Sequence, residues 1–284
     1  MAVIQNLLKR YYWWLPCSLY SADANAWGLV THLYFAHSLL WAMPLLDPRL
    51  RNAIKRFPQL VMAGACLPDL AVVSKRFSQT HAWENAHTLL LAAKSDEETA
   101  IAIGYASHLY VDVIAHHHFV PAHEAMWLEN KMMTHIASEW AMDGYLNKLV
   151  DVSPRTLLTR HQNEIANFIA PQFNCSLKQT RYALRSLAFW DGILRGVKLP
   201  ILIHRTAQLF DKKLDKNFVY YVAKTQMAME NIGTMLDGFN PLLLPELKSL
   251  NLSELTAWRH RCVNHLKLQH PLPIRYFEVY TEEL

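Results

Sequence analysis

Apolar residues recur three or four positions apart through most of the chain, and prolines and asparagines interrupt this pattern. Such spacing is typical of amphipathic helices that bury one face. Prolines at positions 44, 48, 58 and 68 divide the N-terminal part into shorter segments. The pattern predicts an all-α, multi-helix bundle with helices at residues 29–43, 50–56, 59–66, 82–94, 96–117, 126–149, 155–170, 177–196, 200–212, 216–237 and 253–268, while the tail 274–284 could add one short strand.

The first apolar segment, residues 27–46, carries no charged side chain and is about long enough to cross a bilayer. It contains two histidines, His32 and His37, which argue against contact with lipid. No comparable second segment follows, and the rest of the chain is ordinarily polar. We therefore predict a buried core helix and no transmembrane segment.

Composition supports one large helical domain. The chain has 284 residues, of which 52% are hydrophobic and nine are Trp, so a sizeable core can form. Only eight glycines are present, which argues against a sandwich, a barrel or a Gly-rich phosphate loop. The four cysteines are widely spaced without a CxxC pair, so neither a disulfide framework nor a thiolate zinc site is indicated.

Positive charge is concentrated in one region. The net charge is only +4, but residues 153–213 hold ten Lys/Arg against three Asp/Glu. Such a region could attract a phosphate-bearing ligand, or it could be a solvated basic helix face.

The N-terminus allows two interpretations. Lys9 and Arg10 precede an apolar stretch, and Ala24 and Ala26 flank Asn25 in the small-x-small form of a signal-peptidase site. The aromatic residues and a proline make this stretch a poor signal core. Residues 1–26 are therefore either a signal peptide or a retained helical extension of a domain covering 27–284. Cleavage would place the protein in the periplasm or outside the cell, and retention in the cytoplasm.

Histidines are concentrated in the first half, where ten of fifteen lie between residues 32 and 135. His108 and Asp112 are four residues apart, as are His135 and Glu139, so each pair shares a helix face, with Asp143 one turn beyond Glu139. An imidazole nitrogen beside a carboxylate oxygen suits zinc, and several such pairs can converge in a bundle core. Either pair alone is also typical of an ordinary hydrogen-bonded or surface pair.

The order of these candidates resembles a known family. The segments WGLVTH, LPDL, QTHAWENAH, SHLYVDVIAHHH and HIASEWAMD, within residues 27–143, are similar to the zinc-dependent phospholipase C superfamily. That superfamily includes fungal zinc-dependent single-strand nucleases, and its N-terminal domain resembles that of mammalian glycosylphosphatidylinositol-specific phospholipase D. The resemblance implies a phospholipase C/nuclease-like helical bundle that holds three zinc ions.

The resemblance also implies roles for individual residues. Asp69, His81, His108 and Asp112 would bind one ion, and Asp112 would bridge to a second ion bound by His32. Trp27 would add its amine and carbonyl to that second ion if cleavage made it the first residue; otherwise two ions are expected. Asp69 is either the general base or a direct ligand.

A third ion would take His135, Glu139 and one histidine of the run 116–118. The spacing in nucleases and bacterial phospholipases favours His118, our choice, whereas the phospholipase D spacing leaves His116 open. His87 is a rival to His81, but QTHAW matches the family segment better. His117 and His123 are expected to be structural.

A zinc cluster of this kind suits phosphodiester hydrolysis. The sequence favours a phospholipase C-like enzyme that cleaves phospholipid headgroups, with peripheral membrane contact. Two alternatives are a zinc-dependent single-strand nuclease and a non-catalytic helical protein that zinc stabilises.

Overall fold

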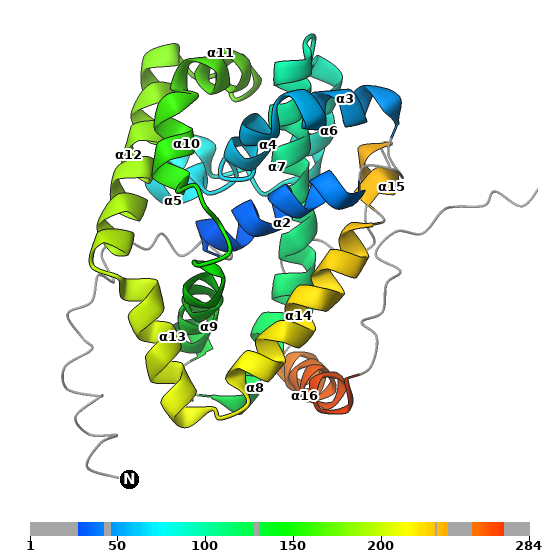
Figure 1. Cartoon of the computed structure of the whole chain (residues 1–284), viewed down its shortest axis with the longest axis vertical. Coiled ribbons are helices and arrows are strands. Elements are labelled where there is room, and N and C mark those ends of the chain that lie inside the picture. The colour runs from blue at the N-terminus through cyan, green and yellow to red at the C-terminus, as the bar shows by residue number, and fades with distance from the viewer. Residues whose placement is uncertain (1–27, 43–46, 128–130, 231, 238–251, 270–284) are drawn as a thin grey trace, which may run out of the picture.

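The computed structural model describes residues 28–42, 47–127, 131–230, 232–237 and 252–269, and the fold is described for these (Figure 1). They form α-helices joined by turns, with one 3₁₀ segment, one π-helical segment and no strand among them. The prediction of an all-α bundle is therefore confirmed. The predicted strand at 274–284 lies outside the described residues.

The helices follow one another in the expected order. Their bounds are α2 Leu29–Ala42, α3 Pro48–Arg56, α4 Pro58–Gly64, α5 Leu70–Val73, the 3₁₀ segment η4 Lys75–Phe77, α6 Trp83–Ala92, α7 Asp96–Ile114, the π-helical segment η5 Ala115–Phe119, α8 Val120–Met126, α9 Lys131–Leu146, α10 Pro154–Arg160, α11 Gln162–Gln172, α12 Leu177–Gly196, α13 Leu199–Phe210, α14 Leu214–Met229, α15 Ile232–Leu236 and α16 Leu252–Leu268.

Local sequence signals explain where several helices begin. Ser95 accepts a hydrogen bond from the Glu98 amide at the start of α7, whose first turn is acidic and so complements the helix dipole. Ser176 and Gln179 form a reciprocal capping box at the start of α12. Prolines occupy the first positions of α3, α4 and α10, where their missing amide costs nothing.

Three predicted helices differ from the observed ones. The segment expected as one helix at 96–117 changes to a π-helix after Ile114, the segment expected at 155–170 is divided into α10 and α11, and the segment expected at 216–237 is divided into α14 and α15. Pro121 contributes to the first change, because it has no amide to donate to the carbonyl of His117, four residues earlier. The structure satisfies that carbonyl from α16 instead.

Helix α7 is the centre of the bundle. Every residue from Thr99 to Ile114 is buried, and α2, α3, α4, α6 and α14 pack around it (Figure 1). A helix surrounded in this way cannot be amphipathic, which is why its apolar residues run all round. Side chains from α7 therefore face several neighbouring helices at once.

Helices α4 and α7 approach so closely that glycine is required at their crossing. A Cβ atom on Gly104 would lie 1.9 Å from the carbonyl oxygen of Val61, and one on Gly64 would lie 2.2 Å from that of Ile101. Backbone therefore meets backbone here. The end of α4 comes close enough for the Ala65 carbonyl to reach a side chain of α7.

Helix α2 is a core helix, as predicted from segment 27–46. Leu33, Phe35 and Leu39 have no exposed surface, and α2 packs against α4, α7 and α9. Among the described residues, no helix has the length and apolar character needed to span a membrane.

We predict that Gly104→Ala lowers the free energy of unfolding by about 3 kcal/mol or more, because the added methyl group forces two backbones apart. Gly196→Ala is the matched control, since nothing lies within 4 Å of a Cβ at that position. Thermal unfolding followed by circular dichroism measures both variants. Equal melting temperatures would show that the α4–α7 crossing tolerates separation.

Candidate metal centre

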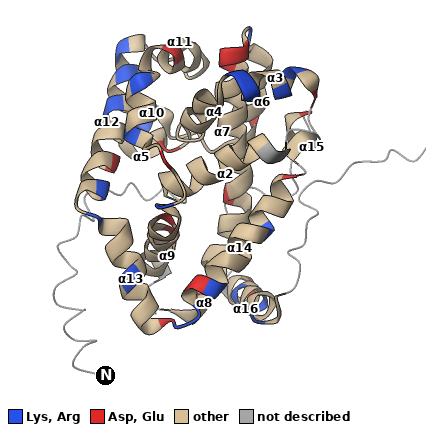
Figure 2. Ribbon diagram, viewed as in Figure 1, with Lys and Arg blue, Asp and Glu red and all other residues tan. Residues whose placement is uncertain are grey.

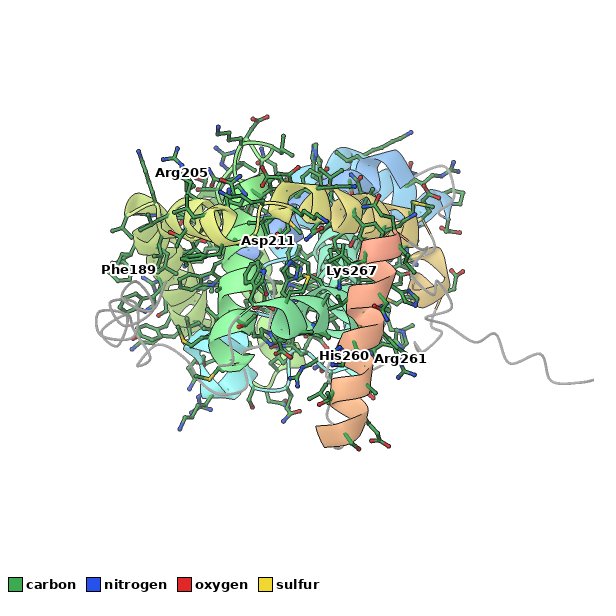
Figure 3. The ribbon with its side chains drawn as sticks, turned by 90° about the horizontal axis from the view of Figure 1, so that it is seen from below. Phe189, Arg205, Asp211, His260, Arg261 and Lys267 are labelled. Atoms are coloured by element: carbon green, nitrogen blue, oxygen red, sulfur yellow. The ribbon has the colours of Figure 1, made fainter. Side chains whose placement is uncertain are left out.

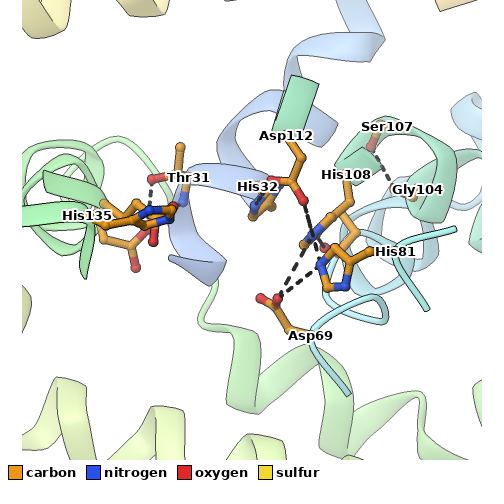
Figure 4. Close-up of polar contacts among 12 residues, drawn as sticks. Thr31, His32, Asp69, His81, Gly104, Ser107, His108, Asp112 and His135 are labelled. Carbon is orange, nitrogen blue, oxygen red and sulfur yellow. Dashed lines mark hydrogen bonds and ion pairs between the residues drawn. The ribbon is translucent and has the colours of Figure 1, made fainter. Parts of the chain in front are cut away.

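Five metal-ligand side chains from four parts of the chain meet inside the bundle. His32 comes from α2, Asp69 precedes α5, His81 precedes α6, and His108 and Asp112 come from α7 (Figure 4). Their ligand atoms form two overlapping sets, each with all atoms within 4.8 Å of one another: His32, His108 and Asp112, and Asp69, His81 and His108. We call these five residues the first group.

Asp112 is at the middle of the first group. Its Oδ1 atom lies 3.3 Å from Nε2 of His32, and its Oδ2 atom lies 3.1 Å from Nε2 of His108 and 3.6 Å from Nε2 of His81. Oδ1 thus faces the imidazole of His32, and Oδ2 faces those of His108 and His81. This arrangement would allow one oxygen to ligate each of two ions, and the bridging role stays a prediction.

The tautomer and orientation of His108 follow from the close α4–α7 crossing. Its Nδ1 atom lies 2.8 Å from the carbonyl oxygen of Ala65, to which it donates a hydrogen bond. Nε2 is then the nitrogen with a lone pair, and it points towards Asp112 and Asp69. A second hydrogen bond of this kind is how proteins orient a metal-binding histidine.

Several atoms of these sites lack the hydrogen bonds that buried polar atoms usually make. Both carboxylate oxygens of Asp112, both of Glu139 and Nε2 of His108 are buried and make no hydrogen bond of acceptable geometry. Buried polar atoms are nearly always hydrogen-bonded, whereas ligand atoms that converge without a proton between them suit a cation. Imidazole nitrogens with carboxylate oxygens are a zinc-type set, so the residues fit zinc.

A second group of ligand atoms is formed by His116 of the π-helical segment with His135 and Glu139 of α9. Nε2 of His135 lies 3.1 Å from Oε1 of Glu139, and the rings of His116 and His135 are 5.2 Å apart. Glu139 is fully buried, while the side chain of His135 keeps 17% of its surface exposed. This second group corresponds to the expected third ion.

The structure places His116, and not the preferred His118, in the second group. In a helix His116 lies one turn after Asp112 on the same face, whereas His118 is roughly a third of a turn away. The His118 ring instead packs 5.7 Å from that of Trp258, and burial lowers its pKa to about 3. The structure therefore favours the alternative, His116, over the preferred His118, and the identity of this ligand stays a prediction.

Asp143 does not join the second group, although it follows Glu139 by one helical turn. Its Oδ1 atom accepts hydrogen bonds of 2.8 Å from both the amide and the hydroxyl of Thr31, and its Oδ2 atom accepts one of 2.7 Å from Arg195. A carboxylate at this place stabilises the N-terminus of α2. Asp143 thus holds the helix that carries His32.

The remaining candidate residues from the sequence belong to neither group of ligands. His87 belongs to none of the metal-ligand sets found among the described residues. His123 donates a 2.7 Å hydrogen bond from Nδ1 to the carbonyl oxygen of Phe119, as expected for a structural histidine. Trp27 lies outside the described residues, so its role as a ligand and the removal of residues 1–26 stay predictions.

Burial controls the protonation of the carboxyl groups. It raises the pKa of Asp69 to about 8, against the effect of the His108 imidazole, and that of Glu139 to about 7, against His135. Burial would raise the pKa of Asp112 as well, but His108 and His32 hold it well below its usual range. A cation beside Asp69 and Glu139 would favour their ionised, ligating forms.

Helix α16 supports the second group through residues that sequence reasoning missed. Arg259 donates a 2.7 Å hydrogen bond from Nε to Oε2 of Glu124, whose Oε1 lies 3.7 Å from Nδ1 of His135. Trp258 donates a 2.6 Å hydrogen bond from Nε1 to the carbonyl oxygen of His117. Pro121 is the one sequence signal for this contact, because it leaves that carbonyl without its usual helical donor.

Comparison with known proteins gives one match. A family model described as zinc-dependent phospholipase C matches residues 31–186, which is more than half of the 284-residue chain. Searches of curated proteins and of solved structures each give no significant match. The matched region contains every residue of both groups and ends before α16.

We predict that Arg259→Gln weakens zinc binding at the second group about tenfold, because Glu124 would lose the partner that holds it beside His135. Lys267→Gln, an exposed change on the same helix, is the control. Zinc retained per chain is measured during titration with a chelator, with helicity checked by circular dichroism. Identical retention in both variants would exclude a supporting role for Arg259.

Proposed function

Because the chain belongs to the zinc-dependent phospholipase C family, we propose that it is a zinc-dependent phosphodiester hydrolase that cleaves phospholipid headgroups. The observation that carries this proposal is the convergence of two buried groups of imidazole and carboxylate ligands in one helical bundle. A structural zinc site needs only one closed set of four ligands, whereas neighbouring ligand sets with a carboxylate between them, here Asp112, suit a catalytic centre that holds more than one ion.

The proposed ligands follow from the two groups. Asp69, His81, His108 and Asp112 would hold one ion, His32 and Asp112 a second, and His116, His135 and Glu139 a third. Bound zinc would supply positive charge to the phosphate oxygens and to the leaving oxygen, and would lower the pKa of its bound water.

Differences in exposure support a direction of approach for the substrate. The side chains of His32, His108 and Asp112 have no exposed surface, whereas those of His81 and Asp69 keep 9% and 7%. A phosphodiester would therefore approach from the side of Asp69 and His81. On that side, we propose that Asp69, beside its role as a ligand, also accepts the proton of an attacking water.

The test of the proposal uses the full-length chain loaded with zinc. We predict at least two zinc ions per chain by elemental analysis, and release of the phosphorylated headgroup from phosphatidylcholine that a chelator stops and added zinc restores. Single-stranded DNA is assayed in parallel. Cleavage of DNA without lipid would identify a nuclease, and metal-dependent stability with neither activity would identify a non-catalytic zinc protein.

The position of Asp112 between two ligand sets leads to a second prediction. Asp112→Asn is expected to reduce turnover about 100-fold even at saturating zinc, because the change removes charge from both proposed ions. Glu139→Gln affects one proposed ion only, so a loss of about tenfold that added zinc partly restores is expected.

Both variants are assayed over a zinc titration after their helicity is checked. If Asp112→Asn keeps near wild-type turnover on the substrate that the parent cleaves, Asp112 does not bridge two ions.

A further inference from the structure

Helix α12 presents an apolar face to solvent. Tyr182, Phe189 and Val197 are 70%, 55% and 65% exposed, with Ile193 between the last two at 39%. These positions are seven and four residues apart, so they share one side of the helix. The opposite side, with Ala183, Leu184 and Leu187, is buried against α5, α10 and α11. The apolar residues on the outside are therefore not needed to hold the fold together.

The charges on this outer face are all of one sign. Lys178, Arg185 and Lys198 are exposed on the helix or directly after it, and basic residues are spread along α12 in Figure 2. The one carboxylate of α12, Asp191, is buried and accepts a 2.8 Å hydrogen bond from Nε of Arg195. The exposed side of α12 thus combines large apolar side chains with positive charge only.

We propose that this outer face of α12 docks the protein onto the surface of an anionic phospholipid membrane. A helix with apolar residues flanked by Lys and Arg lies in the interface of a bilayer, where its rings and aliphatic groups enter the headgroup region and its cations meet lipid phosphates. The choice of lipid as the partner rests on the proposed function, whereas the docking itself requires no hydrolysis.

Two other partners fit the face less well. Single-stranded nucleic acid would use the positive charge and the rings, but Ile193 and Val197 offer it no stacking surface. A second copy of the chain, related by two-fold symmetry, would bring the same cations opposite one another. An anionic lipid surface can contact both the aliphatic and the basic residues of this face, and it is therefore the partner that fits the face best.

The position of α12 relates the docking face to the metal centre. The inner side of α12 packs against α5, which begins at the residue after Asp69. Arg195 of α12 also binds Asp143, which holds the start of α2. Docking through α12 would therefore place the side of the bundle that carries α5 and Asp69 next to the lipid surface. In Figure 3, Phe189 lies at the edge of the molecule, away from Lys267 on α16.

The experiment measures flotation of the full-length, zinc-loaded protein with phosphatidylcholine vesicles that contain or lack phosphatidylglycerol. Stronger binding to the anionic vesicles is expected, and it should weaken when salt rises from about 0.1 M to about 0.5 M. Phe189→Ser should lower the partition coefficient about tenfold, and Arg185→Gln about fivefold. Leu91→Ser, at another exposed apolar residue, and Lys267→Gln should leave it unchanged.

Four results would overturn the docking proposal. The first two are that the protein does not bind anionic vesicles, or that Phe189→Ser and wild type bind them equally. The third is that the protein binds a single-stranded oligonucleotide and not vesicles, and that Phe189→Ser reduces this binding. The fourth is that sedimentation shows a dimer that Phe189→Ser dissociates.

Headgroup release followed in the same samples separates this proposal from the proposed function. Vesicle binding without release counts against hydrolysis and supports docking. Release from soluble short-chain phosphatidylcholine without vesicle binding counts against docking and supports hydrolysis.

Discussion

Burial of ionisable groups inside α7 is the constraint on which the rest of the structure depends. Asp112 and His108 have no exposed surface, and burying an uncompensated charge in a protein core costs several kcal/mol. The imidazoles of His108 and His32 offset part of that cost for Asp112, and Asp69 and His81 complete a zinc-type ligand set around them. The helix that carries the chemistry is therefore also the helix around which the bundle packs.

Two of the ligands, His108 and His32, are held by contacts outside the ligand sets. The glycine crossing of α4 and α7 brings the Ala65 carbonyl to His108, and Asp143 binds the first turn of α2 and so holds His32 in place. These contacts are made by backbone atoms and buried polar groups, which tolerate little movement. The precision of the centre thus comes from helix packing, since none of these ligands lies on a long loop.

The C-terminal helix links the two halves of the chain. Helix α16 lies beyond the residues that the family model matches, yet Arg259 and Trp258 reach Glu124 and the π-helical segment that carries His116. A π-helical turn leaves irregular backbone that needs an outside partner, and such turns are frequent at functional sites. The second group therefore depends on a part of the chain with no ligand of its own.

The sequence by itself determined the helical class, the course of most helices and the residue types of the centre, because helical periodicity and the four-residue His–carboxylate spacing are local properties. It preferred His118 to His116 for the second group, assigned no role to Arg259, and gave Asp143 no part in holding α2. Those outcomes depend on which face each helix turns towards its neighbours and on contacts between residues more than a hundred positions apart, such as Asp143 with Thr31 and Arg259 with Glu124. Spacing along one helix carries no information on such pairs, so only the tertiary structure could decide them.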